Sequence, residues 1–310
     1  MTPPLVGAAD IRAAAERIRP AVHRTPLLGG DGFWLKPEHR QRTGSFKARG
    51  AFNAVARLTA DHVLAQSSGN HGRAVAYAAA RHGLRATVVL PDTAPVLKVD
   101  AVHALGARVV VVPPALREST TAELAARTGA TVIGSADLDV IAGHGTVGAE
   151  IVADLPDVRT VLVPVCNGGL LAGVAAAVKA VSPATRVVGV EPALAGDAAE
   201  SLRLGTLVRW PVEQTYRTIA DGLRAPVLGE PAWRHIRVLV DDIVTVDEDS
   251  IVAAQEFLSA RFGVLAEPSG AVATAAYLTG QSLGATVAVV SGGNVAATVP
   301  AGERVSVEHG

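Results

Sequence analysis

The sequence predicts an α/β protein with mostly parallel sheets, and three observations lead to this prediction. Short apolar segments of strand length alternate with segments of helical character along the 310 residues. The strand-like segments are rich in valine and contain few polar residues, as expected of parallel strands covered on both faces. Several helix-like segments begin directly after polar turns that contain glycine, which is where open α/β sheets bind their ligands.

Six segments are predicted as strands and five as helices. The strands are expected at residues 86–90, 108–112, 161–165, 186–190, 243–246 and 286–290. The helices are expected at residues 74–82, 96–105, 170–181, 249–262 and 271–278. This alternation implies right-handed crossovers between parallel strands. Four polar turns precede helices, at residues 43–45, 67–72, 166–169 and 269–270. Since ligands collect at the carboxyl ends of strands, we expect these turns to form one composite site.

Composition and charge exclude several classes of protein. The 28 Lys and Arg against 29 Asp and Glu give a formal net charge of -1, which argues against binding to nucleic acid. Hydrophobic residues make up 49% and charged residues only 18%, so the chain is predicted to be ordered and to bury a large core. Its length leaves room for about two domains.

The sequence also predicts a cytoplasmic protein that does not interact with a membrane. The uncharged stretch 160–178 contains Pro164, Gly168 and Gly169, so it is interpreted as strand, turn and helix rather than a bilayer-spanning helix. The N-terminal residues lack the apolar segment of a secretory signal. The single cysteine, Cys166, excludes an intramolecular disulfide or a cysteine-based zinc cluster and suits a reducing compartment.

Lys47 is the strongest candidate for a chemical role. It stands at a predicted helix start beside Phe46 and is followed by apolar residues, although the positive end of the helix dipole disfavours a cation there. Burial and the dipole both lower the pKa of an amine, which a Schiff-base nucleophile requires. A surface lysine whose stem packs on Phe46 is the alternative that spacing alone leaves open.

Six motifs in this order resemble the fold-type II pyridoxal-phosphate enzymes, most closely the serine/threonine dehydratase and serine racemase branch. They are T-G-S-F-K-A-R-G-A at 43–51, S-S-G-N-H-G at 67–72, V-I-A-G-H-G-T at 140–146, T-I-A-D-G at 218–222, E-P-S-G-A at 267–271 and S-G-G-N at 291–294. The resemblance covers residues 11–294 and implies a tryptophan synthase beta-like fold with two three-layer α/β domains. The large pyridoxal-phosphate-binding domain would comprise residues 1–60 and 137–310. A small inserted domain at 61–136 would close over the substrate.

The resemblance also assigns roles to individual residues. Lys47 would bind the cofactor as an imine and act as a base on one face of the substrate Cα, and Ser68 would face the other side. Phe46 would lie against the pyridine ring, Asn70 would bind the 3-hydroxyl and Ser291 would meet the ring nitrogen. The other implied cofactor contacts are Cys166, Asn167, Gly168, Gly169, Leu170, Gly222 and Glu267. The implied substrate contacts are Ser67, Ser68, Gly69, Asn70 and His71.

The implied phosphate loop departs from the family pattern. Relatives usually have four glycines there, and their N–H groups bind the phosphate at the start of a helix. This chain has Cys166, Asn167, Gly168 and Gly169, followed by Leu170. Since main-chain donors survive a change of side chain, we expect phosphate binding to be retained.

A metal site is implied by Glu191, Ala195 and Asp197. Their spacing resembles the divalent-cation site of serine racemases, which uses two carboxylates and a backbone carbonyl. Such oxygen ligands suit Mg²⁺ or Ca²⁺. Two solvated acids in a loop are the alternative.

By resemblance, the activity is α,β-elimination from a small β-hydroxy amino acid, L-serine or L-threonine, which gives a 2-oxo acid and ammonia. Amino-acid racemisation by Lys47 and Ser68 stays open, because two opposed groups allow inversion at Cα. A hydroxyaspartate dehydratase stays open because Arg117 could bind a distal carboxylate. The alternative from another class is a catalytically weak pyridoxal-phosphate-binding protein. A nicotinamide enzyme is disfavoured, because no strand leads into a G-x-G-x-x-G turn. The family also implies a homodimer.

Overall fold

The computed structural model describes residues 4–67, 69–281 and 284–295. Its ten strands are β1 (Leu28–Gly30), β2 (Phe33–Lys36), β3 (His62–Gln66), β4 (Arg85–Pro91), β5 (Arg108–Val112), β6 (Thr131–Val132), β7 (Thr160–Pro164), β8 (Arg186–Pro192), β9 (Asp242–Val246) and β10 (Thr286–Val289). They form a six-stranded sheet in the order β1-β2-β10-β7-β8-β9 and a four-stranded sheet in the order β5-β4-β3-β6. Within the described chain every strand pair is parallel except the β1–β2 hairpin. The predicted α/β class with mostly parallel sheets is confirmed.

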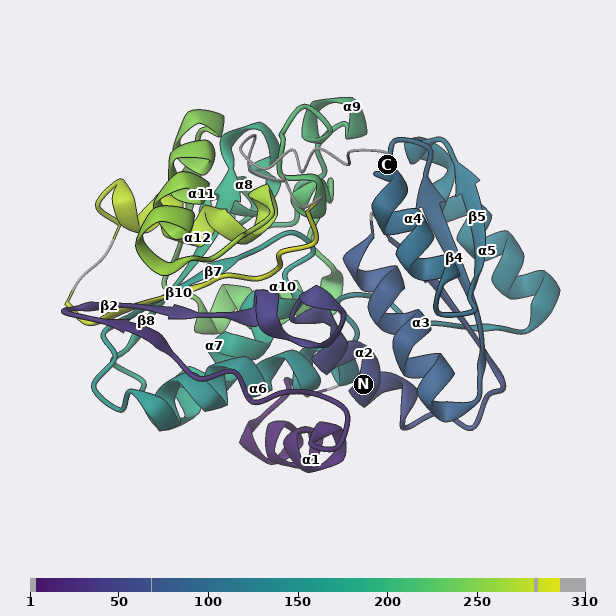
Figure 1. The fold of residues 1–310 in the computed structure, drawn as a ribbon, viewed down its shortest axis with the longest axis horizontal. Coiled ribbons are helices and arrows are strands. Elements are labelled where there is room, and N and C mark those ends of the chain that lie inside the picture. Colours follow the sequence, from purple (N-terminus) through teal and green to yellow (C-terminus); the bar gives the residue numbers. More distant parts are fainter. Residues whose placement is uncertain (1–3, 68, 282–283, 296–310) are drawn as a thin grey trace, which may run out of the picture.

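Helices cover both faces of each sheet (Figure 1). The α-helices are α1 (Ala8–Ile18), α2 (Lys47–Val55), α3 (Asn70–His82), α4 (Val96–His103), α5 (Arg117–Thr128), α6 (Leu138–Asp154), α7 (Gly169–Val181), α8 (Asp197–Leu204), α9 (Val212–Thr215), α10 (Glu230–Leu239), α11 (Glu248–Phe262) and α12 (Pro268–Leu278). Short 3-10 turns are η1 (Glu38–Arg40), η2 (Arg42–Gly44), η3 (Pro114–Leu116), η4 (Ala193–Ala195) and η5 (Asp221–Leu223). We call the four-stranded sheet with α3, α4 and α5 the four-stranded unit, and the remainder the six-stranded unit.

Alternating valine and leucine side chains explain why the sheets are covered on both sides. In β7, Val161 and Val163 join the cluster of α6, α7 and α10, whereas Leu162 joins the cluster of α11 and α12. In β4, Val88 packs with residues of α3 and α4, and Val89 packs with α5. A central parallel strand must therefore be apolar throughout its length.

Helix α2 lies where the two units meet. It packs against α3 of the four-stranded unit and against α6 of the six-stranded unit, and Figure 1 shows it between the two sheets. Its first residue is Lys47. The domain boundaries at 60/61 and 136/137 and the closing of the small domain stay predictions.

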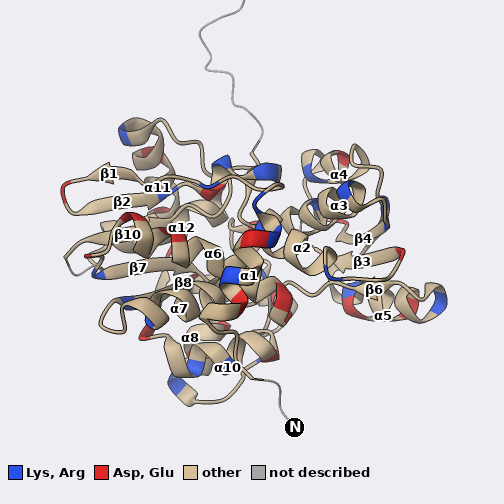
Figure 2. Cartoon of the chain, turned by 90° about the horizontal axis from the view of Figure 1, so that it is seen from below, with Lys and Arg blue, Asp and Glu red and all other residues tan. Residues whose placement is uncertain are grey.

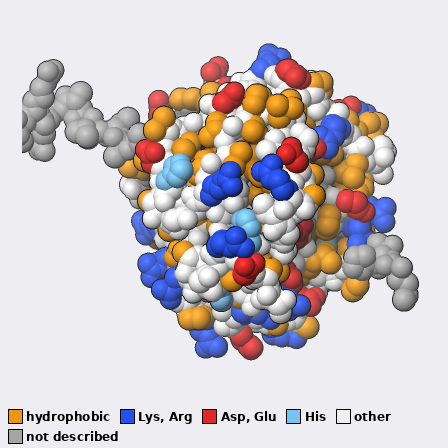
Figure 3. Space-filling view, turned by 90° about the vertical axis from the view of Figure 1, so that its right-hand side faces the viewer, with side chains coloured by type: hydrophobic (Ala, Val, Ile, Leu, Met, Phe, Trp, Pro, Cys, Tyr) orange, Lys and Arg blue, Asp and Glu red, His pale blue; other side chains and the backbone are white. Residues whose placement is uncertain are grey.

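The six predicted strands and five predicted helices are all present, with ends that differ by up to four residues. The sequence analysis missed β1, β2, β3 and β6, because they are short or carry polar residues such as His62. Figure 2 shows acidic and basic residues mixed along the chain, and Figure 3 shows their side chains mixed over the face of the four-stranded unit. Among the described residues, none of the helices combines the length and apolarity that a bilayer crossing requires.

Candidate active site

A cavity of about 380 Å³ lies where the two units meet. The residues that line it come from three of the four predicted polar turns, and Phe46 and Lys47 follow directly after the fourth turn, at 43–45. They include Phe46, Lys47, Ser67, Asn70, His71, Cys166, Asn167, Gly222, Glu267, Ser269 and Ser291. The predicted residues Gly168, Gly169 and Leu170 lie behind this lining, at the start of α7, and Ser68 lies outside the described residues.

The topology explains this convergence. Strands β10 and β7 are parallel neighbours in the six-stranded sheet, so their carboxyl ends lie at the same edge. Ser291 follows the end of β10 and Cys166 follows the end of β7. The N–H of Phe46 donates to the carbonyl oxygen of Ser291 at 3.1 Å, which fixes the start of α2 beside the same edge. The site therefore occupies the usual ligand position of an open α/β sheet.

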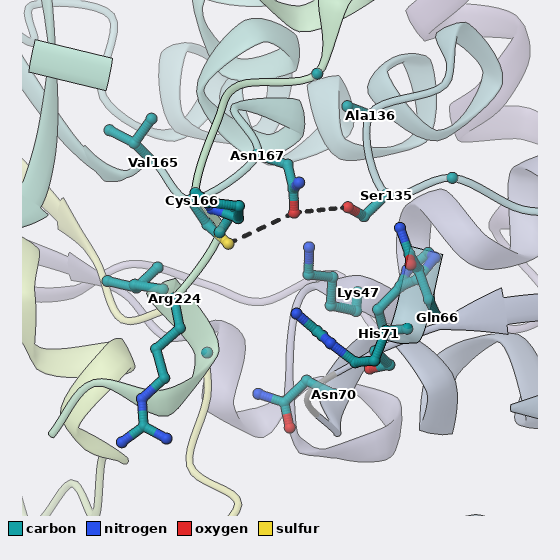
Figure 4. Close-up of a pocket in the computed structure, with 18 of the residues that line it drawn as sticks. Lys47, Gln66, Asn70, His71, Ser135, Ala136, Val165, Cys166, Asn167 and Arg224 are labelled. Carbon is teal, nitrogen blue, oxygen red and sulfur yellow. Dashed lines mark hydrogen bonds between the residues drawn. The ribbon is translucent and has the colours of Figure 1, made fainter. Parts of the chain in front are cut away.

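Lys47 points into the cavity from the first residue of α2 (Figure 4). Its Nζ lies 4.7 Å from the centroid of the Phe46 ring, and no carboxylate pairs with it among the described residues. Burial lowers the pKa of this amine below its ordinary value. A lysine held without a counter-ion in such surroundings is available as a nucleophile or a base.

Arg49 fixes the orientation of α2. Its side chain is only 1% exposed and pairs with Glu38 at 2.8 Å and with Glu150 at 2.7 Å. These two carboxylates raise the pKa of Arg49 above its ordinary value although burial opposes this. Since Arg49 is two residues from Lys47, the buried network holds the first turn of α2 in place. The sequence analysis quoted Arg49 within a motif but gave it no role.

Two glycines begin α7 directly behind the cavity lining. Gly168 has φ +86°, and a Cβ on Gly169 would lie 2.3 Å from the carbonyl oxygen of Ser135. Cys166 also has a positive φ of 56°. The N–H of Gly168 donates to the carbonyl oxygen of Val165 at 3.0 Å, whereas the first N–H groups of a helix have no partner within it and can bind phosphate. Leu170 is buried in the hydrophobic core, so its backbone rather than its side chain is available there.

Asn167 is held by two neighbours across the cavity wall. Its Oδ1 accepts from Ser135 Oγ at 2.9 Å and from Cys166 Sγ at 3.5 Å (Figure 4). Burial raises the pKa of the Cys166 thiol, so it stays protonated and donates weakly. Neither side chain displaces the main-chain donors of the turn, so the expected retention of phosphate binding stands as a prediction.

The residues with implied substrate contacts precede and begin α3, and hydrogen bonds hold their side chains in place. Ser67 Oγ accepts from the N–H groups of Gly69 and Gly72, each at 2.8 Å, so its hydroxyl oxygen stabilises the turn before α3. His71 Nε2 donates to the carbonyl oxygen of Ile133 at 2.9 Å, and burial lowers the pKa of His71 to about 4. Ser291 Oγ donates to the carbonyl oxygen of Ser269 at 3.2 Å.

Pyridoxal phosphate fits these residues. An unpaired lysine and hydroxyl and amide groups line one cavity, and glycines at a helix N-terminus lie directly behind its wall, which matches an aldehyde, a polar ring and a phosphate. The volume also lies within the range of cofactor pockets. The roles of the individual residues stay predictions.

The predicted metal ligands form a separate buried pair. Glu191 and Asp197 are 2% and 1% exposed, and Ala195 lies between them in η4. Burial and the neighbouring Asp197 raise the pKa of Glu191, while burial raises the pKa of Asp197 to about 7. Asp197 Oδ2 has no hydrogen-bond partner in the described part of the chain. A bound divalent cation would lower the raised pKa values of both acids and would give Asp197 Oδ2 a partner. No group of three or more His, Cys, Asp or Glu that could hold a metal occurs among the described residues.

Comparison with known proteins shows the family. Residues 18–298 match the model of the pyridoxal-phosphate dependent enzymes, so the chain belongs to that family. It is 38% identical to the catabolic L-threonine dehydratase of Staphylococcus aureus strain USA300, over 99% of this chain and 93% of the relative. It resembles the structure of maize serine racemase with a TM-score of 0.89 at 36% identity, covering 95% of each chain. It also resembles a pyridoxal 5'-phosphate-dependent aspartate racemase with a TM-score of 0.88 at 34% identity, covering 95% of this chain and 98% of the other.

Proposed function

We propose that the protein is a pyridoxal-phosphate-dependent ammonia-lyase that dehydrates L-serine or L-threonine to a 2-oxo acid. The observation that carries this proposal is the unpaired, half-buried Lys47 in a cavity whose wall includes Cys166 and Asn167, directly before the glycines that start α7. Serine racemases and threonine dehydratases are both relatives of this chain, and elimination is the simpler reaction because it requires a base on one face only.

The chain's own residues would bind the substrate and move its protons. Bound pyridoxal phosphate supplies an electron-withdrawing ring that acidifies the substrate Cα–H. Lys47 Nζ, whose pKa is lowered by burial, accepts the Cα proton. The turn before α3 holds the substrate carboxylate near Asn70, and closure of the four-stranded unit excludes water. Loss of the β-hydroxyl as water, followed by hydrolysis, releases the 2-oxo acid and ammonia.

A panel of amino acids tests the proposal. The holoenzyme is incubated with L-serine and L-threonine, and release of 2-oxo acid is measured, with K47A as the control. The proposal predicts turnover by the wild type and none by K47A. Cofactor binding without turnover of any β-hydroxy amino acid would instead identify a catalytically weak pyridoxal-phosphate-binding protein.

Racemisation is the second candidate, because the chain shares its fold with maize serine racemase at a TM-score of 0.89. It requires a second acid or base opposite Lys47, and Ser68 is the candidate. Measuring D-serine beside pyruvate with L-serine as substrate separates the two reactions. S68A would abolish D-serine formation and leave pyruvate formation if the roles are as proposed.

A dicarboxylic substrate such as hydroxyaspartate is the third candidate. Arg117 and Arg224 both line the cavity and lie on the Tyr216 ring, with guanidinium carbons 5.9 Å and 5.3 Å from its centroid. Neither pairs with a carboxylate among the described residues. Guanidinium groups bind carboxylates in a bidentate manner, and an aspartate racemase is a structural relative. Adding hydroxyaspartate to the panel, with R117M for comparison, tests this candidate.

We also propose that the protein is a cytoplasmic homodimer with Mg²⁺ or Ca²⁺ at Glu191, Ala195 and Asp197. The balanced charge and single cysteine support the compartment, and the partner-free buried oxygen supports the metal. Light scattering of the holoenzyme measures the oligomeric state directly.

A further inference from the structure

We propose that Lys98 is a positioning residue that couples the packing of the two units to the orientation of Asn70 in the cavity. The sequence analysis assigned no role to Lys98. The inference rests on the proposed function only in that Asn70 is taken to contact the cofactor.

Lys98 crosses from one unit to the other. It belongs to α4 of the four-stranded unit, and its side chain is 7% exposed. Its Nζ lies 2.6 Å from Asp221 Oδ2 and 3.0 Å from Glu267 Oε2, and both carboxylates belong to the six-stranded unit. Because all three side chains are largely buried, separating the units would leave charges without partners.

The absence of a side chain at Gly69 leaves room for the alkyl chain of Lys98. A Cβ on Gly69 would lie 2.4 Å from Lys98 Cδ, so the alkyl chain of Lys98 passes directly over the residue before Asn70. Gly69 also has φ +145°, a conformation that other residues avoid. The start of α3 and the lysine stem are thus fitted to each other.

Glu267 and Asn294 then fix both ends of the Asn70 amide. Asn70 Nδ2 donates to Glu267 Oε1, and Asn70 Oδ1 accepts from Asn294 Nδ2 at 2.8 Å. Asn294 is itself held, because its Oδ1 accepts from Arg73 Nη1 at 2.7 Å. If the Asn70 amide were flipped, its oxygen would face the Glu267 carboxylate and its NH₂ group would face the NH₂ group of Asn294. One N–H and one lone pair of the amide stay available for a ligand.

This orientation requires that Glu267 be an acceptor. Glu267 is 1% exposed, and burial together with the nearby Asp221 raises its pKa, while Lys98 lowers it. Without Lys98, a protonated Glu267 would offer an O–H that competes with the amide for the same contact. Loss of Lys98 therefore acts on Asn70 through Glu267.

The test compares K98M in two backgrounds. In the wild-type background we expect K98M to weaken pyridoxal-phosphate binding about tenfold and to change the absorbance spectrum of the bound cofactor, because Glu267 loses the cation that keeps it an acceptor for Asn70. In the E267Q background the carboxylate is already replaced by a neutral group that keeps a carbonyl acceptor for Asn70. There we expect K98M to change cofactor affinity by less than about twofold. K179M is the matched control, since Lys179 forms a comparable pair with Asp241 at 2.8 Å and does not line the cavity.

The outcomes are distinct. Equal weakening of cofactor binding by K98M in both backgrounds would overturn the proposal, as would a loss of thermal stability with an unchanged cofactor spectrum and affinity. If K98M alone does not fold, E267Q and the K98M/E267Q double variant are compared, and a difference between them overturns it. Wild-type protein that binds the cofactor but turns over no β-hydroxy amino acid contradicts the proposed function and leaves the test of Lys98 valid.

Discussion

The partners of a buried lysine distinguish its roles in this molecule. Lys36 is fully buried and pairs with Glu150 at 2.5 Å, and Lys98 lies between two acids. Lys47 has no acidic partner among the described residues, and its amine faces the cavity. Evolution normally pairs buried charges because an isolated one is costly. The unpaired lysine is therefore the one suited to chemistry rather than to stability.

Replacing Lys47 should stabilise the cofactor-free protein. Burial lowers the pKa of Lys47, so between this lowered pKa and the ordinary one the unfolded chain binds more protons than the folded chain, and stability decreases as pH falls through that window. K47M removes this penalty. We expect the free energy of unfolding in urea at pH 7 to rise by about 1 kcal/mol. A less stable K47M protein would show that the lysine has a structural role.

His71 should make the protein sensitive to acid. Burial, with help from Lys47, lowers its pKa from 6.5 to about 4. The unfolded chain therefore takes up a proton first, and stability present above pH 6.5 is lost as pH falls toward 4, by roughly 2–3 kcal/mol.

Urea unfolding at several pH values measures this slope, and H71Q should flatten it while keeping a donor for Ile133. A residual slope should persist in H71Q, because burial also lowers the pKa of His39 to about 4. An unchanged slope in H71Q would contradict the assignment to His71.

At the level of elements, the start of α7 carries the largest departure from the family pattern. Cys166 adopts a positive φ of 56°, a conformation that costs about 1 kcal/mol for a residue with a Cβ. Gly169 is different, because it has no room for a Cβ beside the Ser135 carbonyl. The structure thus accepts a side chain at position 166 and excludes one at position 169.

Two substitutions in this turn should have opposite outcomes. G169A should destabilise the protein by about 2 kcal/mol or more and weaken cofactor binding, because its Cβ collides with backbone. C166G should change stability by less than about 1 kcal/mol, because relief of strain offsets the added freedom of the unfolded chain. Its cofactor affinity should be unchanged if main-chain groups bind the phosphate. Titration with pyridoxal phosphate measures the cofactor affinity of both variants. A large loss of affinity in C166G would show that the thiol binds the phosphate.

Local sequence determined how well each element could be predicted. The run of four valines in β5 marks its strand clearly, whereas β6 has two residues and β1 contains two glycines. Motif residues such as Lys47 and Asn70 could be placed in one site because each lies in or directly after a polar turn that precedes a helix. Lys98 and Asp221 could not, because they are 123 residues apart and only the packing of the two units brings them together.

For the whole molecule, the meeting of the two units creates the cavity, and the buried acid pair lies elsewhere in the six-stranded unit. Glu191 is the residue before the last of β8, and Asp197 begins α8, so a cation there would join a strand to the following helix. Its effect would be on stability and only indirectly on the cavity.

Divalent cations should stabilise the wild-type protein. At saturating Mg²⁺ or Ca²⁺ we expect the melting temperature to rise by roughly 2–6 °C, because the ion binds the folded state and neutralises the pair. D197N should lose this response. An equal rise in D197N would place the ion at another site.

The most direct test of Lys47 as the cofactor-binding amine is mass spectrometry of the holoenzyme after borohydride reduction and proteolysis. The structure predicts the mass of reduced pyridoxal phosphate on the peptide that contains Lys47 and nowhere else. An unmodified Lys47, or the added mass on Lys36 or Lys98 instead, would contradict it.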